Sequence, residues 1–156
     1  MRSIMTDNLD ECYYCGTNQG VELHHCIHGN KENRSLSTQY HLLIGCCSSC
    51  HRGINGIHGK YGKEKDLKLQ AEAQEAWEKR RIKKGKSTPD KVRDEWLSIF
   101  GVDYVQRFEE YVRECEEDLM RDATEEERQG LKDYIDSISE STGYNFWEVN
   151  GNENSD

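Results

Sequence analysis

Residues 12–58 read CYYCGTNQGVELHHCIHGNKENRSLSTQYHLLIGCCSSCHRGINGIH, and this segment holds six of the seven cysteines and all six histidines of the 156-residue chain. Thiolates and imidazoles are the side chains that hold zinc and other transition metals in proteins. From Gly59 onward the chain contains one cysteine and no histidine. We therefore expect the chemistry of this protein in its first third.

Four of these cysteines form two Cys-x-x-Cys pairs, Cys12 with Cys15 and Cys47 with Cys50. Two thiolates at this spacing can supply two of the four ligands of a tetrahedral zinc ion, and the second pair completes the site. The pattern therefore predicts a structural zinc. Cys26 and Cys115 stand alone, which favours small core side chains over metal ligands.

The residues between the two pairs predict a small hairpin. The apolar runs at 21–23 and 41–44 are typical of two strands, and the polar composition of residues 29–37 predicts a loop between them. Because neighbouring side chains on a strand point to opposite faces, His24 and His25 are expected to have different roles.

Beyond the second cysteine pair the pattern is helical. Ser48 or Ser49 can cap a short helix that carries residues 50–52. Longer helices are predicted from apolar positions three and four residues apart, at residues 64–84, 89–100 and 103–122. Thr88-Pro89 is a helix start signal and Gly101 a stop signal.

The composition favours a small, metal-stabilised domain. With 34% hydrophobic and 33% charged residues, a large apolar core is not expected, and small domains with little core usually need a metal or disulfides. No apolar run approaches the length of a membrane span, and the first residues lack the apolar run of a signal peptide. We expect a cytoplasmic, reducing location and no membrane contact, and paired cysteines there bind metal more often than they form disulfides.

The net charge of −9 is unevenly distributed along the chain. Residues 1–63 carry a net +1, residues 64–93 a net +4, and residues 94–156 a net −14. A mildly basic N-terminal part, residues 1–93, is compatible with nucleic-acid binding, even though the whole chain is acidic. The acidic helices after Pro89 are a possible surface for a protein partner.

Several motifs together resemble the HNH endonucleases, whose ββα-metal fold is a hairpin followed by a helix. The order Cys-x-x-Cys, Leu23-His24-His25, Cys47-x-x-Cys50-His51 carries the resemblance. It is closest to phage-encoded HNH nucleases, in the stretches 22–25, 50–53, 55–62, 66–74 and 100–104. The similarity covers about residues 12–104, is most specific in the first third and is absent from the acidic tail.

The resemblance implies a catalytic role for three histidines. His25 would be the general base that activates water, and His24 and His51 would hold the catalytic divalent metal, which is Mg, Mn, Ni or Zn. Asn55 is the favoured third ligand and His58 the alternative. The cysteines would hold a second, structural zinc.

The sequence departs from the family at the residue that orients the base. The family has an asparagine just before the second strand, whereas this chain reads Tyr40-His41-Leu42 there. His41 or Asn33 is expected to take that role, because a base needs a partner that sets its tautomer and ring angle.

Basic residues around the expected site would contact DNA phosphates without reading the base sequence. They are Arg34, Arg52, Lys60 and Lys63.

These expectations combine into an α+β fold with three parts. A zinc-clipped HNH domain is expected at residues 8–63, a helical extension, basic and then acidic, at 64–148, and a disordered tail at 149–156. The predicted function is hydrolysis of DNA phosphodiester bonds. Two alternatives remain open. One is a non-catalytic zinc ribbon that binds DNA or protein. The other is a phage structural or regulatory protein that acts through the acidic helices.

Overall fold

The computed structural model describes residues 2–85, 88–130 and 133. Over these residues the chain has a mixed α and β fold, with a two-stranded sheet and a majority of helix, in agreement with the expected class. By its contacts the chain forms two compact units, residues 1–112 and 113–156. The expected divisions after residues 63 and 148 stay predictions, and the tail at 149–156 lies outside the described residues.

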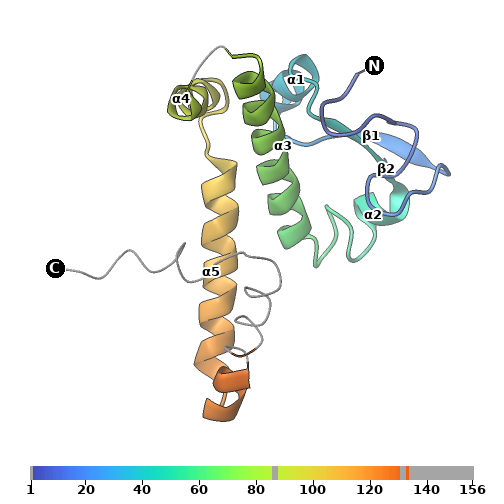
Figure 1. Ribbon diagram of the computed structural model, residues 1–156. Coiled ribbons are helices and arrows are strands. Elements are labelled where there is room, and N and C mark those ends of the chain that lie inside the picture. The colour runs from blue at the N-terminus through green and yellow to red at the C-terminus, as the bar shows by residue number, and fades with distance from the viewer. Residues whose placement is uncertain (1, 86–87, 131–132, 134–156) are drawn as a thin grey trace. The chain divides into compact units, whose positions relative to one another are not determined.

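The sheet pairs two strands in antiparallel register. Strand β1 (Val21–His25) pairs with β2 (Leu43–Cys47), so that Val21 lies opposite Cys47 and His25 opposite Leu43 (Figure 1). The predicted strands are thus confirmed in kind, but β1 runs two residues longer and β2 starts two residues later than expected. Every residue of β2 is buried, which places this strand in the core.

The segment predicted as a polar loop contains a helix, so this prediction was wrong. Helix α1 (Lys31–Gln39) begins where the side chain of Asn30 accepts a hydrogen bond from the backbone N–H of Asn33. Its buried Ser37 accepts a hydrogen bond from the N–H of Ile27 and donates one to the carbonyl of Leu42. An N-cap and one buried contact thus stabilise a helix whose composition is almost entirely polar.

Helix α2 (Ser48–Arg52) follows β2 directly, beside the end of the sheet (Figure 1). The expected short helix is confirmed, although its N-cap position is Cys47 rather than a serine. The helix carries Cys50 and His51, whose side chains lie close to Cys47 of β2 and His24 of β1.

The three longer helices agree closely with the sequence pattern. They are α3 (Lys63–Lys83), α4 (Pro89–Phe100) and α5 (Tyr104–Asp122), and α3 packs against α4. Gly101 ends α4 with a φ of +71°, a conformation that glycine adopts without strain. Trp77, Trp96 and Phe100 lie in one core with β2, so the sheet and the helices share their hydrophobic interior.

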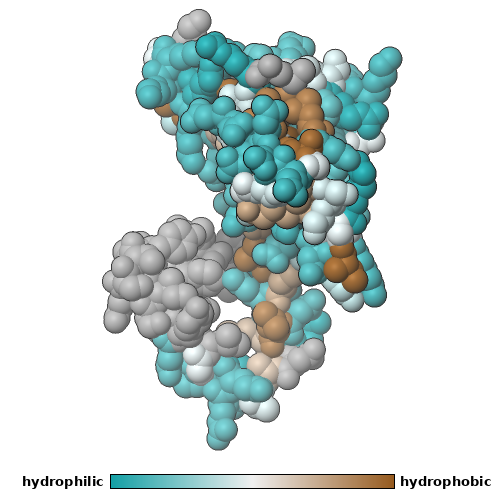
Figure 2. Space-filling model, turned by 90° about the vertical axis from the view of Figure 1, so that its right-hand side faces the viewer, coloured by the Kyte–Doolittle hydropathy of each residue, from teal (hydrophilic) through white to brown (hydrophobic). Residues whose placement is uncertain are grey.

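On the face shown in Figure 2, most of the surface is hydrophilic and the hydrophobic residues form small patches. This agrees with the low hydrophobic content of the chain. Among the described residues, no helix combines the length and apolarity needed to span a membrane.

Gln74 joins α3 to the start of α5 through a hydrogen-bond network. Its side-chain oxygen accepts from the backbone N–H of Tyr104 at 2.7 Å, and its Nε2 donates to Asp103 at 3.0 Å. Arg93 of α4 binds the same carboxylate at 2.7 Å. Gln74 is completely buried, and its hydrogen bond with the N–H of Tyr104 is shielded from water, whereas Asp103 and Arg93 are partly exposed.

We expect Gln74→Leu to lower the free energy of unfolding by about 1–3 kcal/mol, because a leucine of similar size leaves the N–H of Tyr104 buried and unpaired. Chemical denaturation followed by circular dichroism measures this change. Gln106→Leu, at an exposed site in α5, is the control and should have little effect. Equal stability of the two variants would contradict the role given to Gln74.

Candidate metal centres

Four cysteine thiols converge at one end of the sheet. The Sγ atoms of Cys12, Cys15, Cys47 and Cys50 all lie within 4.8 Å of one another. The Sγ atoms of Cys15 and Cys47 are 3.7 Å apart, far longer than a disulfide bond. Zinc–thiolate bonds of about 2.3 Å in a tetrahedron place the sulfurs about 3.8 Å apart. The predicted four-cysteine cluster is confirmed, and it can hold a metal such as zinc.

The first cysteine pair is held against β2 by its loop. The N–H of Tyr13 donates to the carbonyl of Gly45 at 2.9 Å, and the N–H of Gly16 donates to that of Cys12 at 2.8 Å. A Cβ at Gly45 would lie 2.3 Å from the carbonyl oxygen of Leu9, so the loop can approach the strand this closely only over a glycine.

The thiols favour the binding of a cation. Burial raises the pKa of Cys12, but hydrogen bonds from nearby backbone N–H groups outweigh it and lower the pKa to about 6. Burial and the neighbouring thiols raise the pKa of Cys50. One thiolate therefore forms readily, and the full set of four needs a positive ion among them.

The remaining cysteines in the core lie outside this cluster. Cys26 and Cys46 are both completely buried, and burial raises the pKa of each, that of Cys46 to about 12. They remain neutral thiols that pack as small hydrophobic side chains, as predicted for Cys26.

A second cluster consists of imidazoles from three parts of the chain. Ring nitrogens of His24 in β1, His28 in the turn after it, and His58 beyond α2 lie within 4.8 Å of one another. His51 of α2 joins them, because its Nε2 lies 3.1 Å from Nδ1 of His24. The two residues predicted as ligands of one ion, His24 and His51, are therefore in direct contact.

Carboxylates contact a ring nitrogen of two of these histidines. Nε2 of His28 lies 2.7 Å from Oδ1 of Asp66 in α3, and Nδ1 of His51 lies 3.3 Å from Oε2 of Glu22. Burial raises the pKa of Asp66, but its contacts with His28 outweigh this and lower the value, so Asp66 stays ionised. A carboxylate on one ring nitrogen leaves the other nitrogen with a lone pair, which is the arrangement found around metal-bound histidines.

His24 is the most deeply buried member, and its Nε2 has no hydrogen-bond partner. Such an orphaned buried nitrogen is unfavourable unless an ion or another ligand satisfies it. Burial, together with the neighbouring imidazoles, lowers the pKa of His24 to about 3. The ring is therefore neutral at pH 7 and able to donate its lone pair to a metal.

His25 faces the other side of β1, as the alternation along the strand predicts. Its Nε2 lies 3.0 Å from Oγ1 of Thr38 in α1. That hydroxyl already donates its hydrogen to the carbonyl of Arg34, also at 3.0 Å, so it can only accept from His25. The hydrogen therefore resides on Nε2 of His25, and Nδ1 keeps a lone pair.

Thr38 was not foreseen as the partner of His25. Of the two residues proposed for that role, Asn33 donates from its side chain to the backbone carbonyl of His28, and His41 is an exposed residue of the turn after α1. The sequence offered little signal, because Thr38 lies in the helix that was predicted as a loop.

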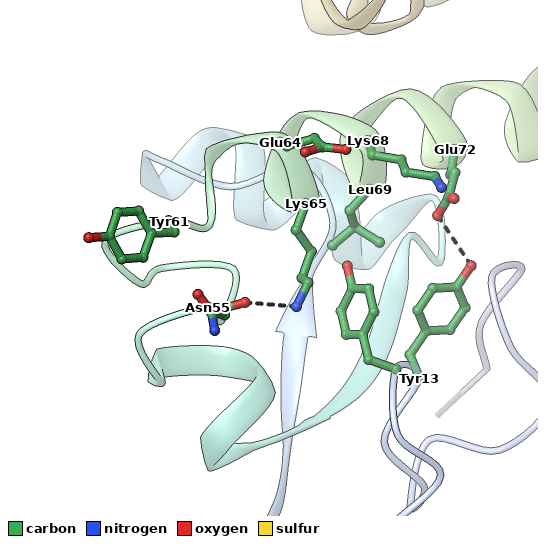
Figure 3. A pocket seen from close by; sticks show the side chains of 9 residues that line it. Tyr13, Asn55, Tyr61, Glu64, Lys65, Lys68, Leu69 and Glu72 are labelled. Atoms are coloured by element: carbon green, nitrogen blue, oxygen red, sulfur yellow. Dashed lines mark hydrogen bonds between the residues drawn. The ribbon is translucent and has the colours of Figure 1, made fainter. Parts of the chain in front are cut away.

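The two candidates for a third metal ligand differ in position. His58 lies in the histidine cluster, whereas the exposed side chain of Asn55 lines a cavity of about 490 Å³ together with Tyr61 and Lys65 (Figure 3). Lys65 Nζ donates to the backbone carbonyl of Asn55 at 2.7 Å. The structure thus groups His58 with His24, and it adds His28, for which the sequence suggested no role.

The basic residues expected to contact DNA are all exposed: Arg34, Arg52, Lys60 and Lys63. Arg52 forms an ion pair with Glu22, which also contacts His51. The ammonium groups of Lys60 and Lys63 lie over the rings of Tyr61 and Tyr111, at 5.1 Å and 4.6 Å from the centroids. Arg34 lies on α1, the helix that also carries Thr38.

Comparisons with known protein families, with curated proteins and with solved structures find no match for this chain. A functional conclusion therefore depends on the residues of the two clusters and on their geometry.

Proposed function

We propose that this protein is a metal-dependent HNH endonuclease, of the type that phages encode, which hydrolyses phosphodiester bonds in DNA. The observation that carries the proposal is the contact of 3.1 Å between the ring nitrogens of His24 and His51. These residues come from a strand and a helix that are far apart in the sequence, and a purely structural zinc site has no need of them.

The position of His25 supports its role as the general base. It follows His24 on the strand but faces the opposite side, where its Nδ1 is free to accept a proton. Burial, together with the positive charge of Arg34, lowers its pKa below the usual value of a histidine. The ring is therefore neutral at pH 7, which is the state that a base requires.

The reaction follows from these residues. Nδ1 of His25 takes a proton from water, the water oxygen attacks the phosphorus atom, and the bond from phosphorus to the leaving sugar oxygen breaks. The histidine cluster would hold a divalent ion, whose charge stabilises the negative charge that develops on the phosphate and the leaving oxygen. Thr38 keeps the base in the correct tautomer, and the exposed basic residues hold the DNA backbone.

The proposal is tested by incubating supercoiled plasmid with the purified protein and Mg²⁺, Mn²⁺, Ni²⁺, Co²⁺ or Zn²⁺. Nicked or linear DNA in the presence of at least one ion, and none with a chelator, is the expected result. Intact plasmid with every ion would contradict it and favour a zinc ribbon that only binds.

Thr38 gives a more selective test of the catalytic geometry. Thr38→Val keeps the shape of the side chain but removes the oxygen that holds His25, so cleavage should slow by about five- to tenfold, the effect of one hydrogen bond of about 1 kcal/mol. Thr38→Ser retains the hydroxyl and should restore most of the rate.

Single-turnover cleavage rates measure the effect, and the affinity for DNA should stay the same in both variants. If the valine variant cleaves as fast as the natural protein, Thr38 does not position the base.

A further inference from the structure

We propose that the histidine cluster binds a transition-metal ion through nitrogen alone, and that His28, braced by Asp66 of α3, is one of its ligands. The use of this ion in DNA cleavage rests on the proposed function, whereas the ligand set does not.

His28 lies as close to the cluster as the residues that the sequence singled out. Its ring centroid is 4.8 Å from that of His58 and 5.4 Å from that of His24. For comparison, the centroids of His24 and His51 are 4.9 Å apart. The ring centroids of His51 and His58 are 5.0 Å apart. The centroids of His24 and His58 are 5.2 Å apart, and His28 joins these two rings in the group whose nitrogens lie within 4.8 Å of one another.

The free nitrogens of these rings are directed by their partners. Asp66 occupies Nε2 of His28, which leaves Nδ1 for an ion. Glu22 contacts Nδ1 of His51, and Nε2 of that ring lies 3.1 Å from Nδ1 of His24. Nε2 of His24 is buried without a partner. His24 and His28 thus each keep one nitrogen available to an ion, and a carboxylate on the other nitrogen, as Asp66 provides for His28, is the arrangement typical of metal-bound imidazoles.

The donor set favours a particular class of ion. Imidazole nitrogen suits Zn²⁺, Ni²⁺, Co²⁺ and Cu²⁺, whereas Mg²⁺ prefers oxygen ligands in an octahedron. The nearby carboxylates of Asp66 and Glu22 already contact histidines and so act as braces. We therefore expect the ion to be a transition metal and not magnesium.

The involvement of Asp66 also links the site to the helical core. Asp66 belongs to the first turn of α3, and Leu69 and Ala73 of the same helix are completely buried in the shared core. Occupancy of the site should therefore stabilise the packing of α3 on the sheet, because an ion that binds only the folded state shifts the equilibrium toward it.

The test measures metal binding directly. The 156-residue chain is loaded with zinc, and zinc content per chain is determined after gel filtration. We expect two ions per chain for the natural protein and one for His28→Ala, whose cysteine cluster remains filled. Cobalt titration of the second site, followed by the visible absorbance of Co²⁺, should show a loss of affinity of more than about 100-fold for His28→Ala and about 10–100-fold for Asp66→Asn.

Two controls separate this ligand set from the alternatives. Asn55→Ala and His41→Asn should keep two ions and unchanged cobalt affinity, and millimolar Mg²⁺ should not displace Co²⁺. Full occupancy and affinity in both His28→Ala and Asp66→Asn, or displacement of Co²⁺ by Mg²⁺ at similar concentration, would overturn the proposal. If His28→Ala does not fold, the cobalt affinity of the conservative Asp66→Asn variant tests the ligand set by itself.

The outcome is independent of nuclease activity. A protein that binds the second ion as described but leaves plasmid intact would contradict the proposed function and preserve the site. Cleavage of DNA by a protein whose histidine cluster binds no transition metal would contradict the proposed site and preserve the proposed nuclease function.

Discussion

His25→Ala is expected to lower the rate of DNA cleavage by about 100–10,000-fold, the usual effect of removing a general base. The substitution removes the only group proposed to accept the proton from water. It leaves His24 in place on the opposite face of β1, and the side chain of His25 is only half-buried, so folding should be retained. Rates are measured on plasmid under single-turnover conditions with the most active ion.

Two further measurements identify the cause of the loss. DNA affinity and metal content should match those of the natural protein, which shows that the chemical step alone is affected. His41→Asn is the control, because it changes an exposed histidine whose φ of +62° asparagine tolerates well. Cleavage by His25→Ala at the normal rate would remove His25 from the mechanism and favour the zinc-ribbon alternative.

Cys47→Ser is expected to have the largest effect on stability. It removes one of four thiolates from a cluster that joins the N-terminal loop, the end of β2 and helix α2. A structural zinc contributes on the order of 10 kcal/mol to the folding of small domains at pH 7. The loss of one ligand should therefore abolish cooperative unfolding of the first unit or lower its midpoint temperature by more than about 10 °C.

Cys115→Ser provides the matched control, because this thiol lies on α5, outside the metal cluster. It should unfold like the natural protein and retain the same zinc. A strong chelator should reproduce the effect of Cys47→Ser in the natural protein. Thermal unfolding that is unchanged by both treatments would show that no structural metal holds this fold.

Much of the candidate site was predicted from local pattern. The two Cys-x-x-Cys pairs predicted the cysteine cluster, because this spacing itself limits how the thiols can be arranged. The helices at 63–83, 89–100 and 104–122 follow from periodic apolar positions and from end signals such as Thr88-Pro89 and Gly101.

The carboxylates that contact the histidines were not predicted from local pattern. Glu22 and His24 are two residues apart on a strand and so share a face, a signal that could have suggested Glu22 as a partner of the cluster. Asp66 gave no such signal, because its contact with His28 depends on how α3 returns to the sheet. Helix α1 was missed because its cap and its one buried serine outweigh a composition typical of loops.

The sequence by itself determined which cysteines form the metal cluster and where the main helices begin and end, since these properties depend on spacing within a few residues. Only the tertiary structure decided which histidines meet. His28, His51 and His58 reach His24 through separate turns and helices, and Thr38 reaches His25 from α1. Contacts between distant segments depend on the packing of the whole core, and no local pattern in the chain encodes them.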